Sequence, residues 1–259
     1  MRIFARMRPA VLLLISFGAA STISYAQSQS LGLEQIVSRM SLARTAARDH
    51  NVAYTVKREY QLSPAGAAKA SADVVADVSF FPPSEKQYVI VKAEGNDRGA
   101  GIVRRILDHE VVMANHWQPY VVSAANYDFA LVGREAIDGH ECYVLQLSPK
   151  RDAVELVRGK AWVDAQDFSI RRIAGQTAKN PSFWIKNLNV TINYGQVNGV
   201  WLETSTEAVA EVRLAGTHVL TSRELDVRTA TLSARASKPA VPHRNREHVA
   251  ADTAAWVAH

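Results

Sequence analysis

The first reactive cluster of the sequence is a pair of histidines with a carboxylate beside one of them. His109 and His116 are two helical turns apart, so a helix would place both on one side, with Glu110 next to the first. A structural or catalytic zinc site needs at least three protein ligands of this kind. Because no third ligand is evident near them, the sequence predicts no metal site.

The second cluster surrounds the single cysteine, Cys142, which follows His140 and Glu141. A thiol next to a base could act as a nucleophile. However, adjacent residues of a strand point to opposite faces, and Cys142 lies within an apolar strand pattern, where a small buried thiol is the usual outcome. A lone cysteine also excludes an intramolecular disulfide. The sequence therefore predicts a structural thiol.

Enzyme motifs are missing from the rest of the chain. The patterns G-x-S-x-G and H-E-x-x-H, a phosphate-binding glycine loop and paired metal-binding cysteines do not occur. We therefore expect no catalysis and no cofactor.

The ends of the chain differ in composition from its middle. Arg2, Arg6 and Arg8 precede an apolar run, and Ser24-Tyr25-Ala26 fits a cleavage site, so residues 1–26 are predicted to be a signal peptide. An uncleaved signal anchor is the alternative. Residues 27–229 are expected to form one domain, and residues 230–259, which are small, polar and proline-containing, a disordered tail. The predicted location is the periplasm.

The excess of basic over acidic residues is concentrated at these ends. The formal net charge is +5 and the pI about 9.4, but the first segment contributes arginines without acids, and the tail is also basic. The middle is close to neutral, so nucleic acid is not an expected partner.

Apolar residues in the middle of the chain recur with two spacings, one typical of helices and one typical of strands. Helical spacing predicts helices over 32–49, from Leu33, Ile36, Val37 and Met40, and over Ile102–Met113. Period-two alternation and turn residues predict strands. The expected strands cover residues 52–61, 72–81, 87–93, 126–133, 142–147, 160–163, 168–173, 187–194, 201–214 and 217–228.

These elements predict a mainly β (α+β) fold. Roughly ten strands would form a strongly curved antiparallel sheet or half-open β-barrel, with the helices covering its concave side and residues 138–175 in its middle. A two-sheet sandwich with helices at one edge is the alternative. The interior of a small barrel is either filled by side chains or left as a ligand cavity, and both outcomes stay open.

Several short stretches resemble a known superfamily. They are Asn126-Tyr127-Asp128-Phe129, Asp138-Gly139 before Cys142-Tyr143-Val144-Leu145, Pro149-Lys150, Gly159 before Trp162-Val163-Asp164, and Pro181-Ser182-Phe183-Trp184. Together with the export signal, they are similar to the periplasmic outer-membrane lipoprotein-sorting (LolA/LppX/RseB-like) superfamily, over about Leu31 to Arg228. The resemblance implies an incomplete antiparallel barrel with an apolar cavity for acyl chains. The functional arginine and aromatic positions of the superfamily's lipoprotein carrier cannot be matched residue by residue to this sequence, so none of them is assigned here.

The resulting functional prediction is an exported carrier that shelters an acyl chain or the lipid moiety of a lipoprotein. The helix over Ile102–Met113 would act as a lid. The alternative is an envelope sensor or scaffold that binds another protein on its sheet face. Expected partners are thus a lipid, a lipidated protein or an envelope protein; transient contact with a membrane surface stays open, and we expect a monomer. The residues expected to contact lipid are Phe80, Ile90, Ile106, Leu107, Leu145, Trp162, Ile170 and Trp184.

Overall fold

The computed structural model describes residues 31–49, 52–116 and 121–229. The chain divides into two compact units, Met1–Leu31 and Gly32–His259, and all described helices and strands belong to the second. The predicted signal peptide and the predicted disordered tail lie outside the described residues. The elements are α1 (Leu33–Asp49), β1 (Tyr54–Pro64), β2 (Ala72–Phe81), β3 (Glu85–Gly95), α2 (Asp97–Asn115), β4 (Tyr127–Ile137), β5 (His140–Pro149), β6 (Val157–Asp164), β7 (Ile170–Thr177), β8 (Ile185–Val197), β9 (Val200–Val212) and β10 (Gly216–Thr229).

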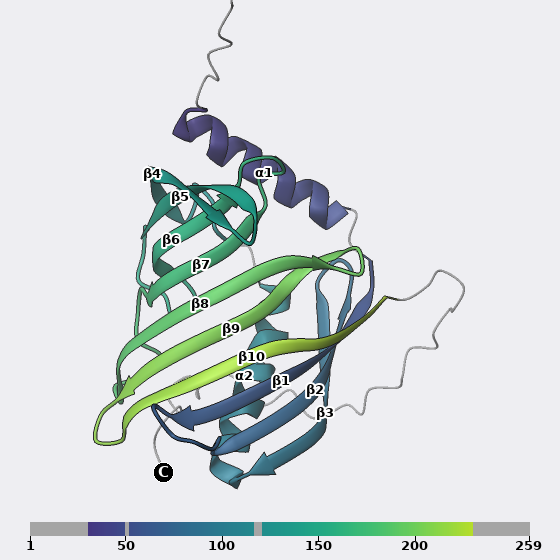
Figure 1. Cartoon of the computed structure of the whole chain (residues 1–259), viewed down its shortest axis with the longest axis vertical. Helices are drawn as coiled ribbons and strands as arrows, with labels where there is room; N and C mark the ends of the chain where they lie inside the picture. The colour runs from purple at the N-terminus through teal and green to yellow at the C-terminus, as the bar shows by residue number, and fades with distance from the viewer. Residues whose placement is uncertain (1–30, 50–51, 117–120, 230–259) are drawn as a thin grey trace, which may run out of the picture. The chain divides into compact units, whose positions relative to one another are not determined.

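The ten strands form one antiparallel sheet in the order β3-β2-β1-β10-β9-β8-β7-β6-β5-β4. The sheet is not closed, because β3 and β4 are its two edges, and it curves around α2, which packs against β1, β2 and β3 (Figure 1). The predicted mainly β fold with a curved, half-open sheet is confirmed. The prediction that residues 138–175 lie in the middle is wrong: β5 to β7 lie towards the β4 edge, because β1 pairs with β10 and places the long C-terminal strands at the centre.

Helix α2 begins earlier than the sequence pattern predicts. The helix was predicted over Ile102–Met113, yet it starts at Asp97. Asn96 caps it, since its side-chain oxygen accepts a hydrogen bond from the Gly99 N–H at 2.7 Å. A Cβ on Gly99 would approach the Ala72 Cβ to 2.6 Å, so this glycine allows the first turn to lie against β2.

A hydrophobic core lies between α2 and the sheet. Val103 and Leu107 of the helix are fully or almost fully buried, together with Tyr60 of β1 and Val74 of β2. Burying a side chain of this size stabilises a fold by about 1.5–3 kcal/mol. This core attaches the helix firmly to one half of the sheet.

Strand β3 is covered on one face only. In its run Tyr88-Val89-Ile90-Val91, Val89 and Val91 are exposed. Because β3 is an edge strand and α2 covers only one of its faces, Ile90 packs on the core while its two neighbours face outward.

Strands β6 and β7 approach each other closely at two facing glycines. A Cβ on Gly159 would meet the Ala174 carbonyl oxygen at 2.1 Å, and Gly175 has a φ of +156° and is equally crowded. Strand β7 begins at Ile170, not at Phe168 as predicted, because Phe168 has a φ of +60° and belongs to the turn. That turn helps to form the site described next.

The central strands agree with their sequence pattern. Asn198 and Gly199, with φ values of 50° and 82°, make the hairpin turn between β8 and β9 that their residue types predict. Among the described residues, no helix is long and apolar enough to cross a membrane.

Candidate functional site

Two adjoining cavities lie in the region enclosed by the sheet and the helices. The first has a volume of about 810 Å³ and the second about 930 Å³. Both lie within the usual size range of small-molecule sites. They share part of their lining, so they lie next to each other. The shared residues are Arg44, Ala47, Ile192, Gln196, Trp201 and Glu203.

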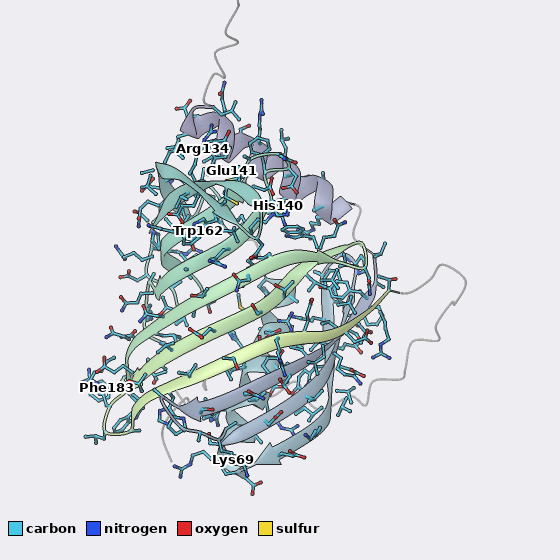
Figure 2. The ribbon with its side chains drawn as sticks, viewed as in Figure 1. Lys69, Arg134, His140, Glu141, Trp162 and Phe183 are labelled. Carbon is cyan, nitrogen blue, oxygen red and sulfur yellow. The ribbon has the colours of Figure 1, made fainter. Side chains whose placement is uncertain are left out.

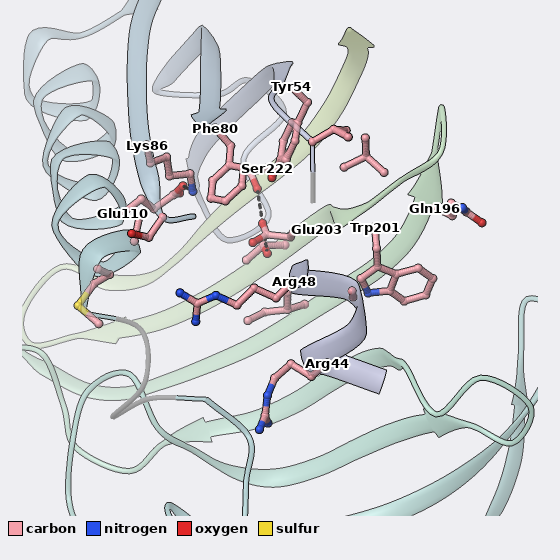
Figure 3. Close-up of a pocket in the computed structure, with 18 of the residues that line it drawn as sticks. Arg44, Arg48, Tyr54, Phe80, Lys86, Glu110, Gln196, Trp201, Glu203 and Ser222 are labelled. Carbon is pink, nitrogen blue, oxygen red and sulfur yellow. Dashed lines mark hydrogen bonds and ion pairs between the residues drawn. The ribbon is translucent and has the colours of Figure 1, made fainter. Parts of the chain in front are cut away.

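The first cavity has aromatic and aliphatic walls. Tyr54 and Phe80 stack with ring centroids 5.4 Å apart on neighbouring strands β1 and β2, and Ile106 of α2 and Leu220 of β10 add aliphatic surface. Figure 3 shows Tyr54 and Phe80 on one side of this space and Trp201 on the other. Such a wall favours an apolar guest.

The floor contains Glu203, which forms an ion pair with Arg58 buried behind it. Arg58 Nη1 of β1 donates to Glu203 Oε1 of β9 at 2.6 Å, and a second guanidinium nitrogen donates to the Glu203 carbonyl oxygen. The Arg58 side chain is only 6% exposed, whereas that of Glu203 is 31% exposed. The Glu203 carboxylate is therefore held by the protein on one side and open to the cavity on the other.

Charge and hydrogen bonds favour the ionised form of this pair. Burial acts to raise the pKa of Glu203, but the Arg58 charge and the Thr206 hydroxyl, which donates at 2.7 Å, outweigh it and lower that pKa. Burial likewise opposes the charge of Arg58, and Glu203 overcomes it and raises the Arg58 pKa. The cavity thus keeps a fixed anion, Glu203, on its floor at neutral pH, with the Arg58 cation buried behind it.

Further cations lie around the first cavity. Lys86 Nζ is 2.5 Å from Glu110 Oε2, joining β3 to α2. Arg44 and Arg48, near the end of α1, also line the space (Figure 3). Arg44 donates to the Val122 carbonyl at 2.9 Å, which fixes the helix beside the cavity. The lining therefore carries more basic than acidic side chains.

The second cavity is bounded by the turn between β6 and β7. Asp164, whose side chain is 2% exposed, accepts from Arg171 Nε at 2.8 Å and lies 3.1 Å from His140 Nδ1. Arg171 in turn lies over the Trp201 ring, 5.0 Å from its centroid. Asp164 thereby positions side chains of the wall without lining either cavity.

The pKa of Asp164 is lowered mainly by backbone hydrogen bonds, whereas that of Glu203 is lowered mainly by the charge of Arg58. Burial acts to raise the pKa of Asp164, but the backbone N–H groups of Gln166 and Asp167 and the nearby Arg171 hold it below its ordinary value. Gln166 donates at 2.8 Å and Asp167 at 3.3 Å. The carboxylate therefore completes the turn.

The predicted lipid contacts fall in different places. Phe80 and Ile106 line the first cavity and Ile170 the second. Leu107 and Leu145 are buried in the protein interior, and Ile90 packs against the core. Trp162 donates its indole N–H to Glu135 at 2.8 Å, and Trp184 packs against exposed Phe183. Neither cavity is lined by these last five residues.

The sequence analysis did not identify the polar floor. Arg58 lies between Val56 and Tyr60 at the buried positions of β1, so an arginine within an apolar alternation was its signal. Glu203 carries no comparable signal, because its partner is far away in the sequence. Trp201, which the sequence analysis did not single out, lines both cavities.

The two histidines and the cysteine of the reactive clusters each have their own surroundings. His109 Nε2 is 3.6 Å from Glu155 Oε1, and His116 Nδ1 is 3.2 Å from the Val112 carbonyl. Within the described part of the chain, no group of three or more histidine, cysteine or acidic side chains could hold a metal ion. Cys142 is buried, and burial raises the pKa of its thiol.

Comparisons with known proteins give the following matches. A family model described as an uncharacterized protein matches residues 122–230. No curated protein matches the sequence. Among solved structures, the chain is similar to a DUF1329 family protein from Desulfovibrio piger, with 14% identity, 77% of this chain and 95% of that chain covered, and a TM-score of 0.39.

Two further solved structures belong to the superfamily suggested by the sequence motifs. A putative outer membrane lipoprotein-sorting protein domain from Vibrio parahaemolyticus has 13% identity, covers 76% of this chain and 94% of its own, and has a TM-score of 0.42. A LolA superfamily protein from Nitrosomonas europaea has 14% identity, coverage of 78% and 96%, and a TM-score of 0.35. At these identities, what those proteins bind is not transferred to this chain.

Proposed function

We propose that this chain is an exported, non-catalytic binding protein that shelters an acyl chain, free or attached to a lipidated protein, in its two joined cavities. The observation that carries this proposal is the pair of adjoining cavities with aromatic and aliphatic walls between the sheet and the helices. A filled interior would have left no room for a guest.

The energetics suit a long apolar chain. Burial contributes about 0.8 kcal/mol per methylene, so a chain of about 16 carbons gains on the order of 10 kcal/mol before ordering costs. Phe80, Ile106 and Leu220 offer such a chain apolar contact in the first cavity, and Ile170 and Ile173 do so in the second. The shared lining lets one chain extend through both.

The polar groups suit the other end of an amphiphile. Ligand sites are mostly apolar with a few placed polar groups that fix orientation. Arg44 and Glu203 lie where the two cavities meet, and the basic excess around the first cavity favours an anionic or hydrogen-bonding headgroup. The predicted export signal supports a periplasmic location for this function.

Native mass spectrometry of the full chain, produced in an exporting bacterial host and purified without detergent, tests the proposal. We expect a bound mass that is released as lipid on unfolding. Ile106→Asp should remove it, because a carboxylate facing the apolar wall would lack a partner. Val112→Asp is the matched control, since Val112 is an exposed residue of the same helix, and it should retain the lipid.

A fluorescent naphthylamine probe provides the second measurement. The delipidated protein should bind the probe, and Ile106→Asp should weaken binding about tenfold or more while its circular dichroism stays unchanged. A protein that carries no lipid and binds no probe would overturn the proposal. Equal losses of lipid and probe binding in Ile106→Asp and Val112→Asp would also contradict the proposal.

The protein-binding alternative has its own support at the open edge of the sheet. Strand β4 is an edge strand, and its Leu131 and Val132 are exposed. Unpaired backbone groups at an edge can pair with an added strand. A tight complex with an envelope protein, lost in Val132→Pro while lipid binding persists, would favour this function.

A further inference from the structure

Two loops meet at the end of the sheet opposite the β8–β9 turn. The β7–β8 loop, residues 178–184, and the β9–β10 turn, residues 213–215, are joined by two hydrogen bonds. The Arg213 N–H donates to the Trp184 carbonyl at 2.7 Å, and Arg213 Nε donates to the Phe183 carbonyl at 2.8 Å. Figure 2 shows Phe183 at this end of the sheet. We call residues Phe183, Trp184, Arg213 and Leu214 the loop tip.

The loop tip presents large apolar side chains to solvent. Phe183 is 75% exposed and Leu214 is 100% exposed. Leu214 also has a φ of +63°, a left-handed conformation that glycine adopts more readily than leucine. Neither the burial nor the backbone geometry of the turn accounts for a leucine at this position.

Aromatic packing gives the loop tip a fixed form. The Phe183 and Trp184 rings meet edge to face, with centroids 5.8 Å apart and an interplanar angle of 77°. The Arg213 guanidinium lies over the Phe183 ring, 4.7 Å from its centroid. A tryptophan, a phenylalanine and a leucine next to an arginine are the residue types that lie at the boundary between lipid tails and headgroups.

The charges around the loop tip are mainly positive. Residues 178–186 and 211–216 contain Lys179, Lys186 and Arg213 but only one acid, Glu211, which pairs with Lys186 at 2.8 Å. Basic side chains next to an apolar insertion are attracted to anionic lipid headgroups, each by a modest amount that salt screens.

We propose that the loop tip inserts Phe183, Trp184 and Leu214 into the surface of a bilayer that contains anionic lipid. A bilayer is the occupant favoured here because the apolar side chains protrude from two turns with cations beside them, and a fluid lipid surface needs no fixed complementary groove. This proposal is independent of what the cavities bind.

The loop tip and the cavity are at opposite ends of the long strands. Strand β8 has 13 residues, which corresponds to about 40 Å, and Gly199 in the β8–β9 turn lines the first cavity. Insertion of the loop tip would therefore tether the protein to the bilayer. The end of the first cavity that Gly199 lines would then be directed away from the bilayer. Membrane attachment and guest binding can consequently be changed separately.

Co-sedimentation of the full chain with vesicles tests the proposal. We expect binding to vesicles of phosphatidylethanolamine and phosphatidylglycerol, weaker binding to phosphatidylcholine alone, and a loss of binding as salt is raised. The double substitution Phe183→Ser with Leu214→Ser should lower the partition constant about tenfold or more. Because both side chains are exposed, the variant should fold normally, which circular dichroism checks.

A matched control and a second readout make the result decisive. Val89→Ser with Val91→Ser removes two exposed apolar side chains from β3 and should leave vesicle binding unchanged. Tryptophan emission should shift to shorter wavelength on vesicle addition, and Trp184→Phe should remove most of that shift while sedimentation persists. No binding by the unchanged protein, or equal binding by the loop-tip variant, would overturn the proposal. A loop-tip variant that loses only a protein partner would overturn it as well.

Discussion

The cavity floor and the β6–β7 turn each contain a carboxylate paired with an arginine, yet the two pairs differ in what surrounds them. Glu203 joins β9 to β1 through Arg58, and its side chain is 31% exposed and lines the cavity. Asp164 is almost fully buried and accepts two backbone N–H groups in addition to Arg171. Both have lowered pKa values, mainly by the charge of Arg58 in the first case and mainly by backbone hydrogen bonds in the second.

This difference separates a carboxylate available to a ligand from one used by the fold. The hydrogen bonds to Asp164 are local and complete a turn whose side chains form part of the second cavity wall. The contacts of Glu203 cross strands that are distant in the sequence and leave one side of the carboxylate open. Substitutions at the two sites should therefore affect stability and guest binding to different extents.

The largest expected effect follows removal of Arg58, the arginine that is buried behind Glu203 of the cavity floor. Arg58→Met should lower the free energy of unfolding by about 2–4 kcal/mol, because Glu203 then lacks a cation and can only partly reach water. Chemical denaturation measures this loss. The double substitution Arg58→Met with Glu203→Met should recover most of it, since an apolar pair can replace a buried ion pair at little cost. A double variant as unstable as the single one would contradict this account of the floor.

A smaller effect is expected at the turn. Asp164→Asn should lower the free energy of unfolding by about 1–3 kcal/mol, because the Arg171 pair is lost and the buried amide cannot accept all the former bonds. Asp167→Asn, at an exposed position of the same turn, should cost less than about 1 kcal/mol. Probe binding should fall less in Asp164→Asn than in Arg58→Met, and the reverse order would show that the turn controls the cavity.

The smallest expected effect is the pH dependence of stability. Both carboxylates have folded-state pKa values below their ordinary values of 4.5 for Glu203 and 3.8 for Asp164. Their contribution to stability is therefore present above about pH 4.5 and is lost as the pH falls through the folded-state values. The free energy of unfolding should fall less steeply between neutral and acidic pH in Glu203→Gln and in Asp164→Asn than in the unchanged protein. An unchanged acid slope in both variants would contradict the lowered pKa values.

The secondary structure was largely predictable because its signals are local. The alternation from Leu188 to Tyr194 and the Asn198-Gly199 turn identified β8 and its hairpin without knowledge of any partner strand. Errors arose where a contact overrides local preference. Gly99 suggested a loop, but it lies within α2 because the helix must approach Ala72. Phe168 suggested a strand, but the hydrogen bonds to Asp164 place it in a turn.

The candidate site was predictable only in part. Phe80, Ile106 and Ile170 face the cavities as their apolar character suggested, whereas Leu107 and Leu145 fill the interior. Periodicity assigns a residue to a face of its element, and it cannot tell whether that face meets another side chain or an empty space. Arg58 and Glu203 were missed because their pairing depends on strand order.

The sequence by itself determined the antiparallel β character, the number of strands and the alternation that gives each strand its inner face, because these depend on neighbours within a few residues. Only the tertiary structure decided that β1 pairs with β10, that the interior contains cavities, and that Phe183 and Leu214 come together at one end of the sheet. Those features depend on contacts between residues far apart in the chain, which local composition does not specify.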